Sequence, residues 1–218
     1  MSDTELIERL AAIPYTGAVS DILDEMGWHD QSLPAAIQSL VPGQTLAGRA
    51  LTLRGQATES EDPDVIFVPF LKMLGEIQPG DVLVYETNDD TAAHLGELSS
   101  ETAKFRGARG AVIDGGARDT EYMVRLGFPV FSRYRTMRDI RGRWRLADYN
   151  VPITVGGVAI EPGDLVLGDR DGVLIIPREI AGDVVTKAEE VVHTENLVRK
   201  AILEGMLPLD AYNKFGRF

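Results

Sequence analysis

The sequence predicts an α/β fold with an added layer of short strands. Two units of buried strand, polar loop and helix follow one another, with strands expected over 82–85 and 111–113 and helices over 97–106 and 119–126. Repetition of this unit is typical of parallel strands, whose following loops open on the same edge of the sheet. Over 152–177 the segments are shorter, rich in Val, Ile and Leu, and separated by Gly and Asp, which favours hairpins.

One domain is expected to span residues 1–218. The chain has 44% hydrophobic and 7% aromatic residues, which fits a globular core, and its composition shows no break along the sequence. Near the N-terminus, apolar side chains recur at helical spacing up to Pro14 and again up to Gly27, which predicts two helices within about 4–27. The stretch 33–40 shows no regular pattern.

The rest of the chain alternates between strands and helices. Residues 48–54 alternate in part between apolar and polar side chains, which predicts a strand with one wet face. Pro63 favours a helix over 64–74, because the N–H that proline lacks has no partner in a first helical turn. Further strands are expected at 153–155, 158–160, 165–167 and 173–176, and a helix of mixed charge over about 178–204 ends at Gly205.

The charge balance bears on possible partners. Acidic residues outnumber basic ones by 34 to 22, which gives a net charge of -12. Such a surface repels phosphate backbones, so nucleic acid is not expected as a partner. Six arginines gather in one segment, but no aromatic ladder or nucleic-acid motif accompanies them, so a solvated or subunit-facing stretch is favoured over a nucleic-acid patch. These arginines are Arg133, Arg135, Arg138, Arg141, Arg143 and Arg145.

The sequence contains no cysteine and three histidines, His29, His94 and His193. The lack of cysteine excludes disulfides, thiolate metal ligands and cysteine nucleophiles, and the histidines do not have the spacing of a zinc site. His94 lies next to the expected pocket, but a lone histidine is more often a surface residue or a hydrogen-bonded structural one, so no catalytic role is expected of it. The acidic start of the chain has no long apolar run behind it, so we expect neither a secretory signal nor a membrane anchor, and a cytoplasmic protein.

Candidate ligand-binding residues follow the strand at 111–113. This β-branched run is closed by Asp114-Gly115-Gly116, which predicts a loop, and Arg118 and Asp119 come just past it. In α/β proteins, groups that handle ligands are usually found past strand ends. A guanidinium matches a carboxylate with two parallel hydrogen bonds, whereas Asp119 either caps the following helix or binds a metal ion. The residues alone favour the cap.

Other acidic residues have both a structural and a functional interpretation. Glu97, in the first turn of an expected helix, either stabilises the helix dipole or belongs to the site, and the residues leave both open. Asp169 and Asp171 resemble a cation-binding loop. Because Asp-Gly pairs are common in turns, a turn is favoured there.

The motif residues resemble those of the RraA-like family. Its signature is matched by Gly96-Glu97, twenty further residues and then Arg118-Asp119, with the glycine-rich segment 114–116 between them. The family includes the 4-hydroxy-4-methyl-2-oxoglutarate / 4-carboxy-4-hydroxy-2-oxoadipate aldolases and the regulators of ribonuclease E activity. The likeness covers most of the chain from about residue 15 onward and includes Gly127-Phe128-Pro129-Val130 and the segment 158–177.

The resemblance implies a three-layer β/β/α swivelling-domain fold assembled into homotrimers or homohexamers. It also implies a class II aldolase, in which a divalent metal such as Mg²⁺ or Mn²⁺, rather than a lysine Schiff base, stabilises the enolate of pyruvate. By resemblance Asp119 holds the metal, partly through waters, which reverses the preference for a cap, and Arg118 binds the pyruvyl carboxylate. The backbone of Gly96, Glu97, Leu98 and Ser99 receives the substrate.

The resemblance extends to catalytic residues, which are Glu97, Arg118 and Asp119. Glu97 stands where the aldolases commonly have an aspartate, so the charge is kept and the reach differs by one methylene. Glu195, in the C-terminal helix, is a candidate to reach the site of a neighbouring subunit. A helix rich in Glu and Lys usually offers only a solvated face, and that alternative stays open.

Three functions follow from these observations. The first is a metal-dependent lyase that cleaves a 4-hydroxy-2-oxo acid into pyruvate and a second oxo acid, and that also decarboxylates oxaloacetate, since both reactions pass through the same enolate. The second is a non-catalytic regulator that binds a ribonuclease. The third is a related lyase for a sugar acid, with the arginine segment 133–145 lining the pocket for a polyanionic substrate. The presence of both Arg118 and Asp119 favours the first.

Overall fold

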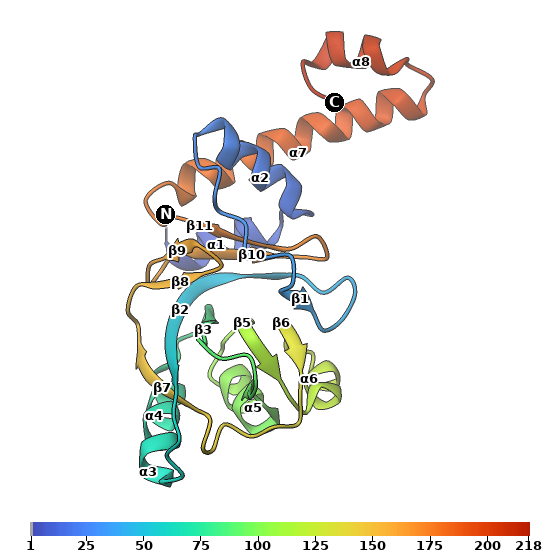
Figure 1. Cartoon of the computed structure of the whole chain (residues 1–218). Helices are drawn as coiled ribbons and strands as arrows, with labels where there is room; N and C mark the ends of the chain where they lie inside the picture. The colour runs from blue at the N-terminus through green and yellow to red at the C-terminus, as the bar shows by residue number, and fades with distance from the viewer. Residues whose placement is uncertain (1) are drawn as a thin grey trace.

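Figure 1 shows the computed structural model of the protein, which describes residues 2–218. Its helices are α1 (Asp3–Ala11), α2 (Thr16–Glu25), α3 (Pro63–Ile66), α4 (Val68–Glu76), α5 (Glu97–Phe105), α6 (Thr120–Leu126), α7 (Ala181–Leu203) and α8 (Pro208–Phe215). Its strands are β1 (Gln38–Ser39), β2 (Leu46–Ala57), β3 (Asp81–Glu86), β4 (Ala93–Leu95), β5 (Gly110–Ala117), β6 (Val130–Arg135), β7 (Trp144–Tyr149), β8 (Ile153–Val155), β9 (Val158–Ile160), β10 (Leu165–Gly168) and β11 (Val173–Ile176).

Within the described part of the chain, nine strands form one mixed sheet in the order β1-β6-β5-β3-β2-β10-β11, with β4 joined to β5 and β7 joined to β2. The strands β2, β3, β5 and β6 are parallel to one another, which confirms the parallel arrangement expected of the strands at 82–85 and 111–113. The later strands are antiparallel: β10 pairs with β2 and β11, and β8 with β9. The predicted α/β class with a hairpin-rich second half is therefore confirmed.

The side chains of β3 alternate between two hydrophobic clusters, which explains its unbroken apolar run. Leu83 and Tyr85 pack with residues of α4, α5 and α6 on one face. Val82 and Val84 pack with the β8–β9 hairpin and with β10 and β11 on the other. A third cluster joins α1, α2 and α7 to the outer side of β10 and β11. The β/β/α layers implied by the resemblance are present, with α1, α2 and α7 covering the outer β-layer (Figure 1).

The expectations for β2 and for the helix over 64–74 are wrong, and each error has a physical cause. The strand β2 is not wet on one face, because it lies between β3 and β10 and is buried from Leu46 to Leu53 except at the half-buried Arg49. The helix expected over 64–74 is broken at Phe67 into α3 and α4. Pro69 has no N–H to donate to the carbonyl one turn earlier, so a continuous helix would lose a hydrogen bond there.

The glycines after Ile113 belong to β5, where a loop was expected. A Cβ on Gly115 would lie 2.6 Å from Nδ1 of His94, and a Cβ on Gly116 would lie 2.4 Å from the ring of Tyr134. Glycine is needed at both positions because neighbouring side chains pack directly on the backbone of the strand.

Five elements have no counterpart among the expectations: β1, β4, β6, β7 and α8. Of these, β7 begins at Trp144, at the end of the arginine segment 133–145, and the buried indole N–H of Trp144 donates to the carbonyl of Thr87 at 2.8 Å. The two N-terminal helices and the long C-terminal helix are confirmed by α1, α2 and α7. Among residues 2–218, no helix combines the length and apolar character needed to cross a membrane.

Candidate active site

The candidate site forms where β4 and β5 end side by side. The N–H of Arg118 donates a hydrogen bond to the carbonyl of Leu95 at 3.0 Å, so the residues after β4 lie against the residues after β5. Gly96 and the first turn of α5 are thereby brought next to Arg118 and Asp119. This meeting agrees with the expectation that the loops after successive parallel strands open on the same edge of the sheet.

Asp119 does not cap its own helix. Its backbone is left-handed, with φ 54°, and its side chain makes no hydrogen bond to α6. Instead Oδ2 accepts a hydrogen bond from the N–H of Glu97 at 3.1 Å, so it satisfies a donor at the start of α5. The cap of α6 that the residues alone favour is therefore wrong. The side chain is 45% exposed, and its Oδ1 has no hydrogen-bond partner among residues 2–218.

Arg118 is held between two carboxylates. Its Nη1 lies 2.9 Å from Oδ2 of Asp139, and its Nε lies 3.7 Å from Oδ2 of Asp119. Within residues 2–218 its Nη2 makes no hydrogen bond, so the two N–H groups of that nitrogen remain available to a ligand. Asp139 belongs to the loop between β6 and β7, and sequence reasoning missed it. Its sequence signal is weak: an aspartate inside the arginine segment 133–145.

Gly96 leaves room for both of these side chains. A Cβ at this position would lie 2.8 Å from Oδ2 of Asp119 and 3.2 Å from Nε of Arg118. The backbone conformation of Gly96 is extended, with φ -135°, and is open to any residue. The glycine is therefore required by the closeness of the carboxylate and the guanidinium, and not by a turn.

An open hollow of about 370 Å³ adjoins the site. It lies at the ends of β5 and β6 and at the start of α6, and its lining includes Arg118, Asp119, Thr120, Arg135, Thr136 and Met137. Gly96, Glu97, Leu98 and Ser99 lie outside this lining. The N–H groups of Leu98 and Ser99 belong to the first turn of α5, where a helix offers no partner, and the side chain of Leu98 is exposed.

His94 lies buried in β4, directly before the site. Its Nδ1 accepts a hydrogen bond from the N–H of Gly116 at 3.2 Å, so Nε2 carries the proton and donates to Oδ2 of Asp89 at 3.1 Å. The ring makes an edge contact with Trp144 at 4.9 Å between centroids. Burial lowers the pKa of His94 from 6.5 to about 4, against the opposing effect of Asp89. Both ring nitrogens of His94 make hydrogen bonds within the fold, which supports a structural role for this residue.

This buried histidine predicts a loss of stability in mild acid. The unfolded chain protonates His94 near pH 6.5, whereas the folded chain does so only near pH 4, so between these values the unfolded state binds the extra proton. We expect the free energy of unfolding to fall by about 3 kcal/mol as the pH decreases across this range. Urea unfolding of the wild type, His94→Gln and the exposed control His29→Gln measures this. An equally steep pH dependence in His94→Gln would contradict the assignment.

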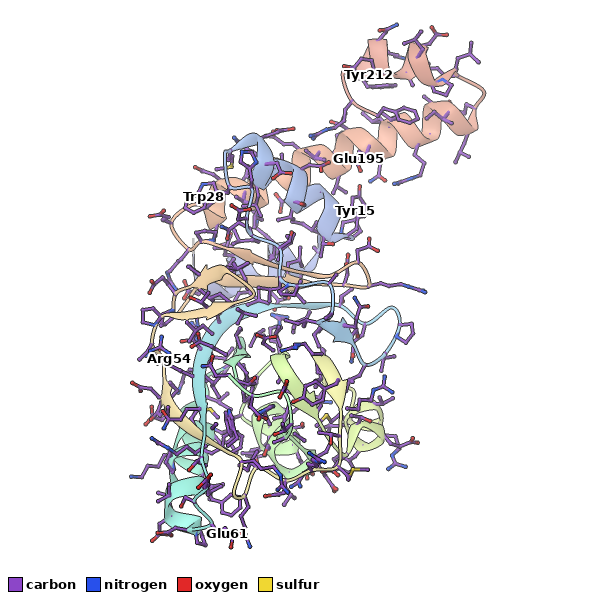
Figure 2. All side chains as sticks on the ribbon, in the orientation of Figure 1. Tyr15, Trp28, Arg54, Glu61, Glu195 and Tyr212 are labelled. Atoms are coloured by element: carbon purple, nitrogen blue, oxygen red, sulfur yellow. The ribbon has the colours of Figure 1, made fainter. Side chains whose placement is uncertain are left out.

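Two other candidate residues lie elsewhere. The hydroxyl of Tyr15 donates a hydrogen bond to Glu195 at the helical end of the molecule, beyond β10 and β11 and away from α5 and α6 (Figure 2). Asp169 accepts hydrogen bonds from the N–H of Thr16 at 2.8 Å and from the N–H of Asp171 at 2.8 Å. The carboxylate of Asp169 therefore holds the start of α2 and closes a turn, and the turn interpretation is confirmed.

Several arginines of the segment 133–145 contact other side chains of the chain. Nη1 of Arg133 lies 3.4 Å from Oδ1 of Asp114, and the guanidinium of Arg141 lies over the ring of Phe67 at 5.5 Å. Arg135 differs from these, because it lines the hollow beside Arg118. The segment therefore contributes one cation to the candidate site.

The donors at the site fit a hard cation that keeps water ligands. Among residues 2–218, no group of three or more His, Cys, Asp or Glu side chains is placed to hold a metal ion. A zinc site with four protein ligands is therefore not present in this part of the chain. Mg²⁺ is commonly bound by one or two carboxylates and several waters. Oδ1 of the exposed Asp119 side chain, which accepts no hydrogen bond in the described chain, is an oxygen ligand of this kind.

Comparison with known proteins identifies the family of this chain. A family model described as RraA-like, aldolase/RraA, matches residues 16–175. The chain belongs to the RraA-like family. An RraA-like relative from Halalkalibacterium halodurans, named as a candidate 4-hydroxy-4-methyl-2-oxoglutarate aldolase, is 32% identical over 97% of this chain and 95% of its own length.

Two solved structures share the RraA-like fold of this chain. Streptomyces coelicolor RraAS2, described as an unusual member of the RNase ES inhibitor RraA protein family, has a TM-score of 0.83 and 29% identity over 92% of this chain and 99% of its own. A protein described among novel cellulases from microbes of the gut ecosystem has a TM-score of 0.84 and 37% identity over 90% of this chain and 87% of its own. The fold implied by the sequence resemblance is therefore confirmed.

Proposed function

We propose that this chain is a divalent-metal-dependent lyase that cleaves a 4-hydroxy-2-oxo acid into pyruvate and a second oxo acid, and that also decarboxylates oxaloacetate. One observation carries the proposal: Oδ2 of Asp119 lies 3.1 Å from the N–H of Glu97 and 3.7 Å from Nε of Arg118. An exposed carboxylate, a guanidinium and the start of a helix thus meet at one strand edge. Family membership and the name of the Halalkalibacterium relative support the proposal.

Each site residue has a role in this reaction. Arg118 binds the pyruvyl carboxylate through the N–H groups that Asp139 leaves available. Asp119 holds Mg²⁺ or Mn²⁺, which when bound stabilises the negative charge that develops on the 2-oxo oxygen. The N–H groups of Leu98 and Ser99, which lack partners within α5, receive substrate oxygens.

Cleavage breaks the bond between C3 and C4 of the substrate. A base takes the proton of the C4 hydroxyl, a carbonyl forms at C4, and the electron pair of the broken bond passes to C3 and the 2-oxo group. A proton then returns to C3 to complete pyruvate. We assign the first transfer to the half-exposed carboxylate of Glu97, in the first turn of α5. Oxaloacetate releases CO₂ from C4 with no hydroxyl proton to remove, so its decarboxylation needs no such base.

Pyruvate release from oxaloacetate tests the proposal. We expect release with Mg²⁺ to exceed that of Mg²⁺ alone, to stop on chelation and to return when Mg²⁺ is restored. Cleavage of 4-hydroxy-4-methyl-2-oxoglutarate is expected to show the same metal dependence. If neither reaction occurs, the lyase assignment is wrong.

A regulatory role is the second candidate, because RraAS2, which shares the fold, is described as a member of an RNase ES inhibitor family. A regulator that only binds a ribonuclease needs neither a metal nor a carboxylate-binding arginine. Inhibition of a ribonuclease that persists in Asp119→Ala, together with no pyruvate release by the wild type, would favour this role over the lyase.

The close packing at Gly96 predicts a specific loss of activity. In Gly96→Ala the added methyl would have to move Oδ2 of Asp119 and Nε of Arg118, now 2.8 Å and 3.2 Å from that position. We expect kcat/KM for oxaloacetate to fall about ten-fold, because misplacement of reacting groups by 1 Å costs about a hundred-fold. Steady-state kinetics measure this, and Gly75→Ala is the control, since a Cβ at Gly75 meets nothing within 4 Å. Equal activity of both variants would contradict the packing argument.

A further inference from the structure

Strand β6 presents Arg135 to the hollow of the candidate site. Side chains of a strand alternate between its faces, so Arg133 and Arg135 share one face and Tyr134 takes the other. The ring of Tyr134 packs on Gly116, and its hydroxyl donates to the carbonyl of Ala92 at 3.1 Å. This packing fixes Tyr134 on one face of β6, so Arg133 and Arg135 lie on the opposite face.

The register places Arg135 beside the residues of the site. Arg135 pairs with Ala117 across the parallel strands β6 and β5, and Arg118 follows Ala117 directly. Adjacent strands lie about 4.8 Å apart. Arg118 and Arg135, which come from neighbouring strand ends, both form part of the lining of the same hollow.

Arg118 and Arg133, the arginines nearest to Arg135 in the sheet, each form an ion pair with an aspartate, whereas Arg135 forms none in the described chain. Arg118 contacts Asp139 at 2.9 Å, and Arg133 contacts Asp114 at 3.4 Å. Across residues 2–218, the side chain of Arg135 makes neither a hydrogen bond nor an ion pair, and it is exposed. An unpaired cation in the lining of an open hollow attracts an anionic group, and a guanidinium binds a carboxylate with particular strength.

We propose that Arg135 binds a second carboxylate of the substrate, remote from the one bound by Arg118, and so makes the site selective for dicarboxylic 2-oxo acids. The inference rests on the proposed lyase function, because it takes Arg118 as the anchor of the pyruvyl carboxylate. The pyruvyl part then lies between Arg118 and Asp119, and the remainder of the substrate extends along the hollow toward β6. Arg135 is a specificity residue in this arrangement and takes no part in bond cleavage.

Binding of two stable 2-oxo acids tests this inference on the full chain. Pyruvate has only the carboxylate assigned to Arg118, whereas 2-oxoglutarate has a second carboxylate and no hydroxyl at C4, so it is not cleaved. Calorimetry in the presence of Mg²⁺ gives Kd for each acid with the wild type and with Arg135→Gln. We expect Arg135→Gln to raise the Kd of 2-oxoglutarate about ten-fold or more, which corresponds to the loss of a hydrogen bond between charged groups. The Kd of pyruvate is expected to stay within about two-fold of the wild-type value.

The control variant is Arg138→Gln. Arg138 is exposed and, like Arg135, has no side-chain hydrogen bond or ion pair with residues 2–218, but it lies outside the lining of the hollow. Loss of 2-oxoglutarate binding in Arg135→Gln alone supports the proposal. An equal loss in Arg138→Gln, or an equal loss of pyruvate and 2-oxoglutarate in Arg135→Gln, would overturn it in favour of a general charge effect.

The same measurement separates this inference from the proposed function. If the wild type binds both acids with equal affinity and Arg135→Gln changes neither, Arg135 has no role in selectivity while the 2-oxo acid site stands. If the wild type binds neither acid, the 2-oxo acid site itself is wrong, and the role of Arg135 is overturned with it.

Discussion

Replacing Asp119 with asparagine is expected to lower kcat/KM for pyruvate release from oxaloacetate about a hundred-fold or more, because a carboxylate ligand of the metal is lost. Asparagine tolerates the left-handed backbone of this position, where φ is 54°, and its amide oxygen can still accept the N–H of Glu97. The substitution therefore removes a negative charge while the backbone and the start of α5 are preserved. Kinetics over a range of Mg²⁺ concentrations measure the effect.

Two comparisons make this result specific. Asp171→Asn removes the same charge from an exposed turn remote from the site, and its activity is expected to match that of the wild type. Urea unfolding of Asp119→Asn is expected to resemble that of the wild type, which excludes a folding defect. Activity of Asp119→Asn within about three-fold of the wild type at saturating Mg²⁺ would refute the metal-binding role, since metal-ligand supports are worth at least about ten-fold.

The elements that could be predicted from the sequence depend on local patterns. The apolar run of β3 and the helices α5 and α6 follow from periodicity and from the residues at their ends. Once two such units follow one another, parallel strands bring their loops to one edge, which places the segment that contains Gly96 at the same edge as Arg118. The shared edge could thus be predicted from the sequence, whereas the hydrogen bond between Arg118 and Leu95 depends on β4, which was not expected.

The elements that could not be predicted depend on contacts between distant residues. The solvent exposure of β2 depends on its pairing with β10, which lies more than 100 residues later in the sequence. The continuation of β5 through Gly115 depends on His94, which packs directly on that glycine. The length of a strand and the exposure of its faces are therefore set by partners that a local pattern does not contain.

The same limit applies to the site. Arg118 and Asp119 are recognisable because they follow a strand end, but the partner of Arg118 comes from the loop after β6, and Asp139 has no local pattern to reveal it. Likewise, the sequence shows six arginines in one segment, whereas only the register of β6 against β5 distinguishes Arg135 from the other five as part of the lining of the hollow.

Replacing Arg118 with lysine is expected to raise KM for oxaloacetate about thirty-fold, with a smaller change in kcat. Lysine keeps the positive charge but has no planar fork, so it cannot bind Asp139 and a substrate carboxylate at the same time with parallel hydrogen bonds. The loss of one hydrogen bond between charged groups corresponds to about 2 kcal/mol, which is about thirty-fold in affinity. Because the carboxylate is bound before bond cleavage begins, the loss belongs mainly to KM.

The substitution Arg118→Lys distinguishes hydrogen bonding to the substrate carboxylate from a purely electrostatic attraction to it. If Arg118 acted only through its charge, lysine would replace it and KM would stay near that of the wild type, which would contradict a carboxylate-binding fork. Arg138→Lys makes the same substitution outside the lining of the hollow, and its KM is expected to be unchanged. A rise in KM for Arg118→Lys alone, measured by steady-state kinetics at saturating Mg²⁺, therefore requires that the shape of the guanidinium, and not merely its charge, holds the substrate.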